Sequence, residues 1–307
     1  MREVIIIGSG PAGFTAGIYT GRAGLNPLLI ASSVEIGGEL MKTTEVENFP
    51  GFPEGTMGPE LMANLQAQAE RFGTEVLYDD VVEVDLTGDV KIVKTGLGET
   101  YEAKTVILAT GAAYRELGLP REKELSGHGV SWCATCDGFF FREKTIAVVG
   151  GGDSAMEEAT FLTRFASKVY LIHRRDSFKA SKIMVDRALN NPKIEVIYNS
   201  TVTELHGETN LTAVTLENTV DGSKSELPLD GLFIAIGNDP RVWLVEDQVE
   251  LTADRFIKVE GRSSKTSLPG VFAAGDVIDP TYRQAITAAG SGCVAALDAE
   301  HYLTDHA

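Results

Sequence analysis

The chain has 307 residues, of which 43% are hydrophobic and 23% are charged. These values are close to the average for globular proteins, so they exclude a disordered chain, a collagen and a small disulfide scaffold. With 44 acidic and 27 basic side chains the formal net charge is −17, which repels phosphate backbones and anionic lipids. We therefore expect neither nucleic acid nor a membrane as a partner, and the length predicts about two domains.

The first predicted elements form a strand–turn–helix–strand unit. In chain order they are an apolar strand at 3–7, the glycine-rich turn Gly8–Ser9–Gly10–Pro11–Ala12–Gly13, a helix at 14–23 and an apolar strand at 27–30. In such a turn Gly8 allows the tight bend, Gly10 lets the backbone approach a pyrophosphate, and Gly13 lets helix and strand pack closely. The free N–H groups at the start of the helix also favour phosphate. The pattern predicts a dinucleotide site.

Short β-type runs follow, separated by glycine and aspartate, and they predict a β-meander. The runs lie at 81–84, 91–94 and 100–103, and they lead to an apolar strand at 105–108 that ends in Ala109–Thr110–Gly111. The first unit is therefore expected to be a βαβ core, a meander and a closing strand with a terminal glycine.

The same arrangement occurs a second time. Its elements are, in order, a strand at 145–149, the turn Gly150–Gly151–Gly152–Asp153–Ser154–Ala155, a helix at 156–165, a strand at 168–172, meander runs at 195–198, 211–216 and 226–229, and a closing strand at 232–234. From the first glycine of the turn to the end of the next strand, both units span 22 positions. The repeat predicts a second dinucleotide-binding domain.

Residues 242–307 contain a small-residue helix, predicted at 283–303, but they are too few to form a core of their own. We therefore expect this segment to pack on the first unit. The predicted fold is α/β, with two Rossmann-like three-layer nucleotide-binding domains that each carry a β-meander. The first domain is discontinuous and comprises 1–112 and 243–307, and the second comprises 113–242.

The two units differ after their second strand, where an NAD site usually has an acidic residue for the ribose. In the second unit this position is basic, because His173, Arg174 and Arg175 follow the strand and Lys179 is close behind. A solvated basic loop is one interpretation. We favour a clamp on the 2′-phosphate of NADPH, since guanidinium groups match phosphate oxygens. The first unit has no such cluster, so we expect it to bind a different dinucleotide, for which FAD is the usual choice.

Two of the three cysteines lie in the sequence Cys133–Ala134–Thr135–Cys136–Asp137, shortly before the second glycine-rich turn. Half a zinc site, a structural disulfide and two inert buried thiols are alternatives. The third cysteine, Cys293, has no histidine near it, so we expect no metal site. The spacing is typical of a redox dithiol, in which Asp137 can carry a proton. So few cysteines also indicate a reducing, cytoplasmic location.

A pyridine nucleotide, a flavin and a dithiol together form an electron-transfer pathway. NADPH provides a hydride, a disulfide accepts two electrons, and a flavin can pass them from one to the other.

Over essentially its whole length the chain resembles the low-molecular-weight bacterial thioredoxin reductases. The stretches that carry the resemblance are Gly8–Ser9–Gly10–Pro11–Ala12–Gly13, Gly37–Gly38–Glu39–Leu40, Thr44–Glu45–Val46–Glu47–Asn48–Phe49–Pro50–Gly51, Cys133–Ala134–Thr135–Cys136–Asp137–Gly138, His173–Arg174–Arg175–Asp176, Phe272–Ala273–Ala274–Gly275–Asp276 and Arg283–Gln284–Ala285–Ile286. Together these stretches are highly specific for that family.

The resemblance implies a homodimeric FAD enzyme that reduces thioredoxin with NADPH. The residues it implies for FAD are Gly8, Ser9, Gly10, Pro11, Ala12, Gly13, Gly37, Gly38, Glu39, Leu40, Asn48, Gly111, Asp276, Arg283, Gln284 and Ala285. Those it implies for NADPH are Gly150, Gly152, Asp153, Ser154, His173, Arg174, Arg175 and Lys179. It further implies that Cys136 faces the flavin, that Cys133 attacks the substrate's disulfide and that Asp137 is the acid. The NADPH domain is expected to rotate about crossings near Gly111 and Gly237.

Two other functions remain open. One is a related flavin reductase that serves another protein disulfide, and the other is a non-catalytic NADPH or redox sensor, against which the intact cysteine pair argues. The chain departs from the family's usual residues at Glu39, where Gln is common, at Lys179, where Arg is usual, and at Asn238, where His is common. No acidic residue directly follows Ile30, so the sequence assigns no contact to the adenine ribose of FAD.

Overall fold

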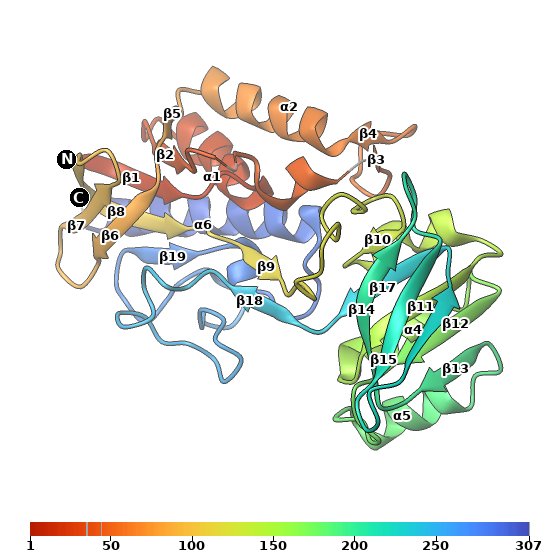
Figure 1. Cartoon of the computed structure of the whole chain (residues 1–307). Helices are drawn as coiled ribbons and strands as arrows, with labels where there is room; N and C mark the ends of the chain where they lie inside the picture. The colour runs from red at the N-terminus through yellow and green to blue at the C-terminus, as the bar shows by residue number, and fades with distance from the viewer. Residues whose placement is uncertain (35, 44, 307) are drawn as a thin grey trace. The chain divides into compact units, whose positions relative to one another are not determined.

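The computed structural model describes residues 1–34, 36–43 and 45–306, and the chain forms two compact units (Figure 1). Unit 1 comprises Met1–Ala113 and Asp239–Ala307, and unit 2 comprises Tyr114–Asn238. The C-terminal segment therefore belongs to the same unit as the N-terminus. Thr44, the first residue of one stretch named above, lies outside the described residues.

The core of unit 1 is a sheet with the strand order β5-β2-β1-β8-β7-β6, in which β19 also pairs with β8. The strands are β1 (Arg2–Ile7), β2 (Leu28–Ala31), β5 (Glu75–Tyr78), β6 (Val81–Asp85), β7 (Lys91–Thr95), β8 (Thr100–Leu108) and β19 (Val271–Ala273). Strands β5, β2, β1, β8 and β19 pair in parallel, whereas β6 and β7 continue antiparallel from β8. The central parallel strands are buried on both faces, which explains their unbroken apolar sequences.

Three helices cover one face of this sheet: α1 (Pro11–Arg22), α2 (Gly58–Arg71) and α6 (Ala285–Asp305). Helix α6 packs closely on α1 at Gly292. A Cβ at this position would lie 2.1 Å from the carbonyl oxygen of Ala12, so only glycine fits there. On the opposite face Val242 and Ile257 pack against Val84 of the meander. The short elements of this unit are η1 (Gly38–Lys42), β3 (Glu45–Val46), β4 (Thr56–Met57) and η3 (Gly275–Val277). Unit 1 thus has the three layers that the sequence predicts.

Two details of unit 1 differ from the prediction. Residues 100–108 form a single strand, which pairs antiparallel with β7 in its first half and parallel with β1 and β19 in its second. One strand therefore serves both the meander and the core. Strand β5 and helix α2 are absent from the predicted elements. Strand β5 has only four residues and none is buried, whereas α2 has an apolar face at Leu61, Met62 and Ala69 that the prediction overlooks.

Unit 2 is built on a parallel sheet with the order β10-β17-β11-β12-β13. Its strands are β10 (Val130–Ser131), β11 (Thr145–Gly150), β12 (Lys168–Ile172), β13 (Ile194–Ile197) and β17 (Gly231–Ala235). One face packs on the helical elements α3 (Ala134–Asp137), η2 (Gly138–Phe141), α4 (Asp153–Leu162) and α5 (Lys182–Leu189). The other packs on a separate antiparallel meander, β14 (Ser200–His206), β15 (Ala213–Asn218) and β16 (Lys224–Pro228). No helix in the described part of the chain has the length and apolar character needed to cross a membrane.

The prediction that 195–198 is the first meander strand is wrong. These residues overlap β13, which pairs in parallel with β12, and the meander begins at Ser200. Ile194 and Val196 pack on the helical side of the sheet, and Ile197 packs on the meander side. Because both faces of β13 are used, it completes the parallel core.

The chain passes between the units twice, through β9 (Ala112–Tyr114) and β18 (Asn238–Pro240), which pair as a two-stranded sheet. Gly111 and Gly237 immediately precede these strands and have φ values of 72° and 104°, in the region that favours glycine. The second crossing lies four residues before the predicted boundary at 242/243. The reason is that Arg241 is already bound within unit 1, where its N–H donates to the Gly111 carbonyl oxygen at 3.0 Å.

Candidate functional site

The first glycine-rich turn is closed on one side and open on the other. A Cβ on Gly8 would lie 2.2 Å from the Ala109 carbonyl oxygen, and one on Gly13 would lie 1.9 Å from the Gly8 carbonyl oxygen. At Gly10, the residue just before α1, a Cβ would meet no atom within 4 Å. The turn is therefore held tightly against β8 and α1 while the start of the helix stays accessible. This is the geometry that a pyrophosphate needs.

A second pair of glycines lies against this turn. The hydroxyl oxygen of Ser9 accepts a hydrogen bond from the Gly37 N–H at 3.0 Å, and a Cβ on Gly38 would lie 3.4 Å from the Gly10 Cα. The next residue, Glu39, forms an ion pair with Arg241 at 3.0 Å. The turn, the glycine pair and the end of the second crossing therefore meet within unit 1.

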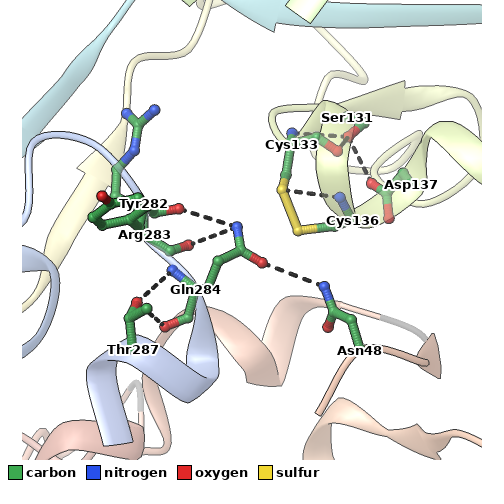
Figure 2. The surroundings of a disulfide bond; sticks show 9 residues. All are labelled: Asn48, Ser131, Cys133, Cys136, Asp137, Tyr282, Arg283, Gln284 and Thr287. Atoms are coloured by element: carbon green, nitrogen blue, oxygen red, sulfur yellow. Dashed lines mark hydrogen bonds between the residues drawn. A yellow bond between two sulfur atoms is a disulfide. The ribbon is translucent and has the colours of Figure 1, made fainter. Parts of the chain in front are cut away.

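Further along unit 1, the start of α6 carries three more of the residues that the resemblance implies for FAD, namely Arg283, Gln284 and Ala285. Asn48 donates from its side-chain nitrogen to the side-chain oxygen of Gln284 at 3.3 Å, and Gln284 forms a capping box with Thr287 (Figure 2). The backbone N–H of Arg283 donates to Asp279 at 2.9 Å. These contacts fix the loop between η3 and α6.

Asp276 carries a carboxyl that is mostly buried. Within the described residues no hydrogen bond reaches its side chain. Burial is the main cause that raises the pKa of Asp276 to about 6; the nearby Asp279 and Glu39 add to the rise, and Arg283 opposes it. A buried carboxyl without a donor is costly, so this position suits a ligand that brings a hydroxyl group.

This raised pKa predicts a pH-dependent stability. The folded, ligand-free protein binds an extra proton at Asp276 between about pH 4 and pH 6, so its stability falls as the pH rises through that window. Asp276→Asn cannot ionise and escapes this loss. Between about pH 4 and pH 7 its unfolding free energy should gain about 3 kcal/mol relative to the wild type. Denaturant titrations of both proteins at each pH measure the difference, and one that stays constant with pH contradicts the raised pKa.

The second glycine-rich turn repeats the geometry of the first. A Cβ on Gly150 would lie 2.4 Å from the Ala235 carbonyl oxygen and 2.6 Å from the Ala155 Cβ, whereas at Gly152 it would meet nothing within 4 Å. Helix α4 begins directly after Gly152, at Asp153. The turn is again closed against the sheet and open at the start of the helix.

The basic segment after β12 is bound to this turn. The backbone N–H of Lys179 donates to the Gly151 carbonyl oxygen at 2.8 Å, and the backbone N–H of Ser181 donates to Asp153 at 2.8 Å. The side chains of Arg174, Arg175 and Lys179 are exposed. Among the described residues they form no ion pair, so their positive charge is available at the start of α4.

His173, which the resemblance also implies for NADPH, lies between the turn and the basic segment. Its ring is 8% exposed, and its two nitrogens lie 3.0 Å from the Gly150 carbonyl oxygen and 2.9 Å from that of Ser177. A Cβ on Gly151 would lie 2.1 Å from the ring. A neutral imidazole has one N–H and can donate to one of these two carbonyl oxygens, so the buried ring packs between the turn and the basic segment and hydrogen-bonds to one of them.

The two predicted cysteines form a disulfide, with their Cα atoms 5.3 Å apart (Figure 2). Cys133 is the N-cap of α3, a helix of four residues, and its sulfur accepts from the Cys136 N–H at 3.2 Å. Cys136 is the more exposed of the two. The spacing that predicts a redox pair thus places the two sulfurs within bonding reach. The remaining cysteine, Cys293, is half-buried on α6, and no group of three or more metal-ligating side chains occurs among the described residues.

Asp137 lies beside the pair and is held by a serine that the sequence analysis does not identify. The hydroxyl of Ser131 donates to Asp137 Oδ2 at 2.6 Å, and it accepts from the Cys133 N–H at 3.0 Å. Burial raises the pKa of Asp137, and the hydrogen bond from Ser131 opposes the rise. A carboxyl with a raised pKa next to a disulfide is a candidate for proton transfer.

An aromatic patch directly follows the pair and is also missed by the sequence analysis. Phe139 and Phe140 are 48% and 39% exposed, and the guanidinium of Arg142 lies 4.4 Å from the centre of the Phe139 ring. The third ring of the run, Phe141, points inward and packs on Phe233. The signal was available in the sequence, because three consecutive phenylalanines cannot all be buried on one short turn.

Comparison with known proteins agrees with this geometry. Residues 2–292 match the family model of the pyridine nucleotide-disulphide oxidoreductases. The thioredoxin reductase of Streptomyces clavuligerus is 61% identical over 303 residues, which cover 99% of this chain and 94% of that protein. The thioredoxin reductase of Mycolicibacterium smegmatis is 58% identical, with coverage of 99% and 97%. Among solved structures, thioredoxin reductase from Giardia duodenalis is 43% identical with a TM-score of 0.94, covering 99% of this chain and 100% of that one. The chain therefore belongs to the pyridine nucleotide-disulphide oxidoreductase family, and it is an oxidoreductase.

Proposed function

We propose that the chain is an NADPH-dependent, FAD-containing reductase of the thioredoxin disulfide. The observation that carries the proposal is the Cys133–Cys136 disulfide beside Asp137, a carboxyl whose pKa is raised by burial. A structural disulfide does not require a carboxyl with a raised pKa beside it, whereas a cysteine pair that is reduced and re-oxidised in each turnover requires a proton donor. The relatives named above are thioredoxin reductases, which supports thioredoxin as the substrate.

We assign FAD to unit 1, where the residues fit it. The open position at Gly10 and the tightly packed Gly8 and Gly13 suit a pyrophosphate at the start of α1. The carboxyl of Asp276, which no hydrogen bond reaches among the described residues, suits a hydroxyl of the ribityl chain. When bound, FAD supplies a carrier for two electrons between a nicotinamide and a disulfide. The remaining residues that the resemblance implies for FAD also belong to unit 1.

We assign NADPH to unit 2. Its glycine-rich turn is open at Gly152, and three exposed cations, Arg174, Arg175 and Lys179, follow the strand next to it. Since the loop is tied to the turn through Lys179 and Ser181, a phosphate bound by the cations would lie near the start of α4. A solvated basic loop would account for the charges, but it would not account for the hydrogen bonds that join the loop to the turn.

The dithiol chemistry uses Cys133, Cys136 and Asp137. In the reduced protein the Cys133 thiolate attacks one sulfur of the substrate's disulfide, and the other sulfur leaves with a proton from the Asp137 carboxyl. The Asp137 carboxylate then takes the proton of Cys136. The Cys136 thiolate attacks the Cys133 sulfur, re-forms the disulfide and releases the second substrate sulfur. The pair loses the two electrons that the substrate gains, and Asp137 returns to its starting state.

The exposed rings of Phe139 and Phe140 support a protein substrate rather than a small disulfide. An apolar surface next to a reactive pair is a feature that a protein partner can cover. The related reductases that serve other protein disulfides remain the second candidate, because the same patch would suit them.

One assay tests these proposals. The purified protein should show a flavin spectrum, and it should oxidise NADPH rapidly only when oxidised thioredoxin is present. A colourless protein that FAD cannot reconstitute would contradict the cofactor assignment. Turnover with another protein disulfide but not with thioredoxin would favour the second candidate, and no turnover with any disulfide would favour the sensor.

We further propose a homodimer located in the cytoplasm. Helix α6 carries an apolar stripe in which Ile286, Val294 and Leu297 are 44%, 36% and 41% exposed, and a second copy of the chain would cover it. Sedimentation equilibrium should give twice the mass of the chain, and Leu297→Glu should increase the monomer fraction. Val220→Glu, at a position 78% exposed in unit 2, is the control. A wild-type monomer at micromolar concentration would contradict the dimer.

Finally, we propose that unit 2 turns relative to unit 1 about the two crossings. The positive φ of Gly111 and Gly237 and the short two-stranded sheet after them suit a hinge. Distances between labels on the two units, measured with and without NADPH, test this, and an unchanged distribution would contradict it.

A further inference from the structure

One hydroxyl group connects the backbone of the disulfide to the acid beside it. Ser131 is 3% exposed and lies on β10, where it pairs in parallel with Phe233 of β17, so its backbone is fixed by the sheet. From there its oxygen accepts the Cys133 N–H at 3.0 Å and lies 2.6 Å from Asp137 Oδ2 (Figure 2). The carbonyl oxygen of Cys133 lies 3.4 Å away.

These contacts serve Asp137 whether or not it is protonated. With Asp137 ionised, the hydroxyl proton of Ser131 points to the carboxylate, since a carboxylate only accepts. With Asp137 protonated, the carboxyl can donate to the serine oxygen, and the hydroxyl proton can turn to the carbonyl oxygen of Cys133. The Cys133 N–H remains satisfied in both cases. A hydroxyl is the smallest group that can both donate and accept in this way.

We propose that Ser131 is a positioning residue, which holds Asp137 beside the Cys133–Cys136 pair and supports its carboxyl in both protonation states. The proposal rests on the function proposed above, in which Asp137 gives and takes a proton in each turnover. It names a contribution from a residue outside the cysteine motif.

The surroundings of Asp137 leave Ser131 as its main polar contact. Helix α3 packs against η2, which has no ionisable side chain, and against α4, which carries Asp153, Glu157 and Glu158. Burial raises the pKa of Asp137, and the hydrogen bond from Ser131 lowers it. The thiols of Cys133 and Cys136 join these groups once the disulfide is reduced. Removing the hydroxyl leaves burial unopposed, so the pKa of Asp137 rises.

Ser131→Ala and Ser131→Thr test the proposal in the complete flavin-loaded protein. In single turnover, the reduced protein transfers electrons to a disulfide, and the rate should fall at high pH as Asp137 loses its proton. In Ser131→Ala the midpoint of this fall in rate should move to higher pH by about one unit, because the hydrogen bond from Ser131 to the ionised Asp137 carboxylate is lost. Ser131→Thr keeps the hydroxyl and should keep the wild-type midpoint. In Asp137→Asn the rate should not show this fall at high pH. The double variant Ser131→Ala/Asp137→Asn should have the same dependence of rate on pH as Asp137→Asn alone.

Infrared titration of the Asp137 carboxyl in the oxidised protein, identified by its loss in Asp137→Asn, gives a readout without any substrate. The same upward shift is expected there. If the chain fails to reduce thioredoxin while this shift is present, the proposed function fails and the role of Ser131 stands. An unchanged Asp137 titration in Ser131→Ala, or a rate lowered equally at every pH, would overturn the proposal.

Discussion

Replacing either Cys133 or Cys136 by serine is expected to abolish thioredoxin reduction while NADPH still bleaches the bound flavin. Hydride transfer from NADPH needs neither sulfur, whereas reduction of a disulfide needs one thiol to attack and a second to resolve the mixed disulfide. With Cys136→Ser, Cys133 can attack but nothing resolves the product, so a stable mixed disulfide with thioredoxin should accumulate. With Cys133→Ser, the Cys136 thiolate should instead perturb the absorption of the oxidised flavin.

Mass spectrometry of each variant mixed with oxidised thioredoxin, together with its visible spectrum, measures these outcomes. Cys293→Ser is the matched control, since this half-buried cysteine lies outside the motif, and it should retain full turnover. An adduct that forms only through Cys136 would reverse the two roles. Full turnover by either variant would remove the pair from the mechanism.

Replacing both Arg174 and Arg175 by alanine is expected to reduce the preference for NADPH over NADH at least about a hundredfold. Each charge-assisted hydrogen bond to the 2′-phosphate is worth about 1.5–3 kcal/mol, and NADH has no such phosphate. Both side chains are exposed and form no ion pair with described residues, so their loss should leave the fold intact. The ratio of kcat/KM for the two nucleotides, measured by flavin reduction, gives the effect.

Arg187→Ala is the control for charge alone. This exposed arginine lies in the last turn of α5, also in unit 2. It should leave the nucleotide preference unchanged. If the double variant at positions 174 and 175 keeps the wild-type preference, the phosphate is bound elsewhere, and Lys179 is then the next residue to replace.

Much of this architecture could be predicted from the sequence because its signals are local. A strand, a glycine-rich turn and a helix follow one another in the chain. The spacing of the glycines therefore predicts close packing at Gly8 and Gly13 and free space at Gly10. The second turn repeats them. The Cys133–Cys136 disulfide also needs only a spacing of three residues on one helical turn.

The errors arose where an element is defined by its neighbours. Residues 194–197 alternate like a meander strand, and only their pairing with β12 makes them part of the parallel core. Strand β5 buries none of its four residues and is defined by its pairing with β2. Helix α2 is a different case, because its apolar face at Leu61, Met62 and Ala69 is present in the sequence and was overlooked. The boundary near residue 242 moved to 238/239 because Arg241 is bonded to Gly111, a residue far away in the chain.

The two glycine-rich turns, the cysteine pair and the basic cluster can be recognised without a structure, because each depends on residues that are adjacent in the chain. The contacts of each side chain, in contrast, depend on residues that folding brings together from distant parts of the chain. Folding buries His173 between two backbone carbonyl oxygens, leaves the carboxyl of Asp276 without a donor among the described residues, and places Ser131 between Cys133 and Asp137. Burial and hydrogen bonding are properties of packed neighbours, so the proton affinities that the chemistry requires arise only when the chain is folded.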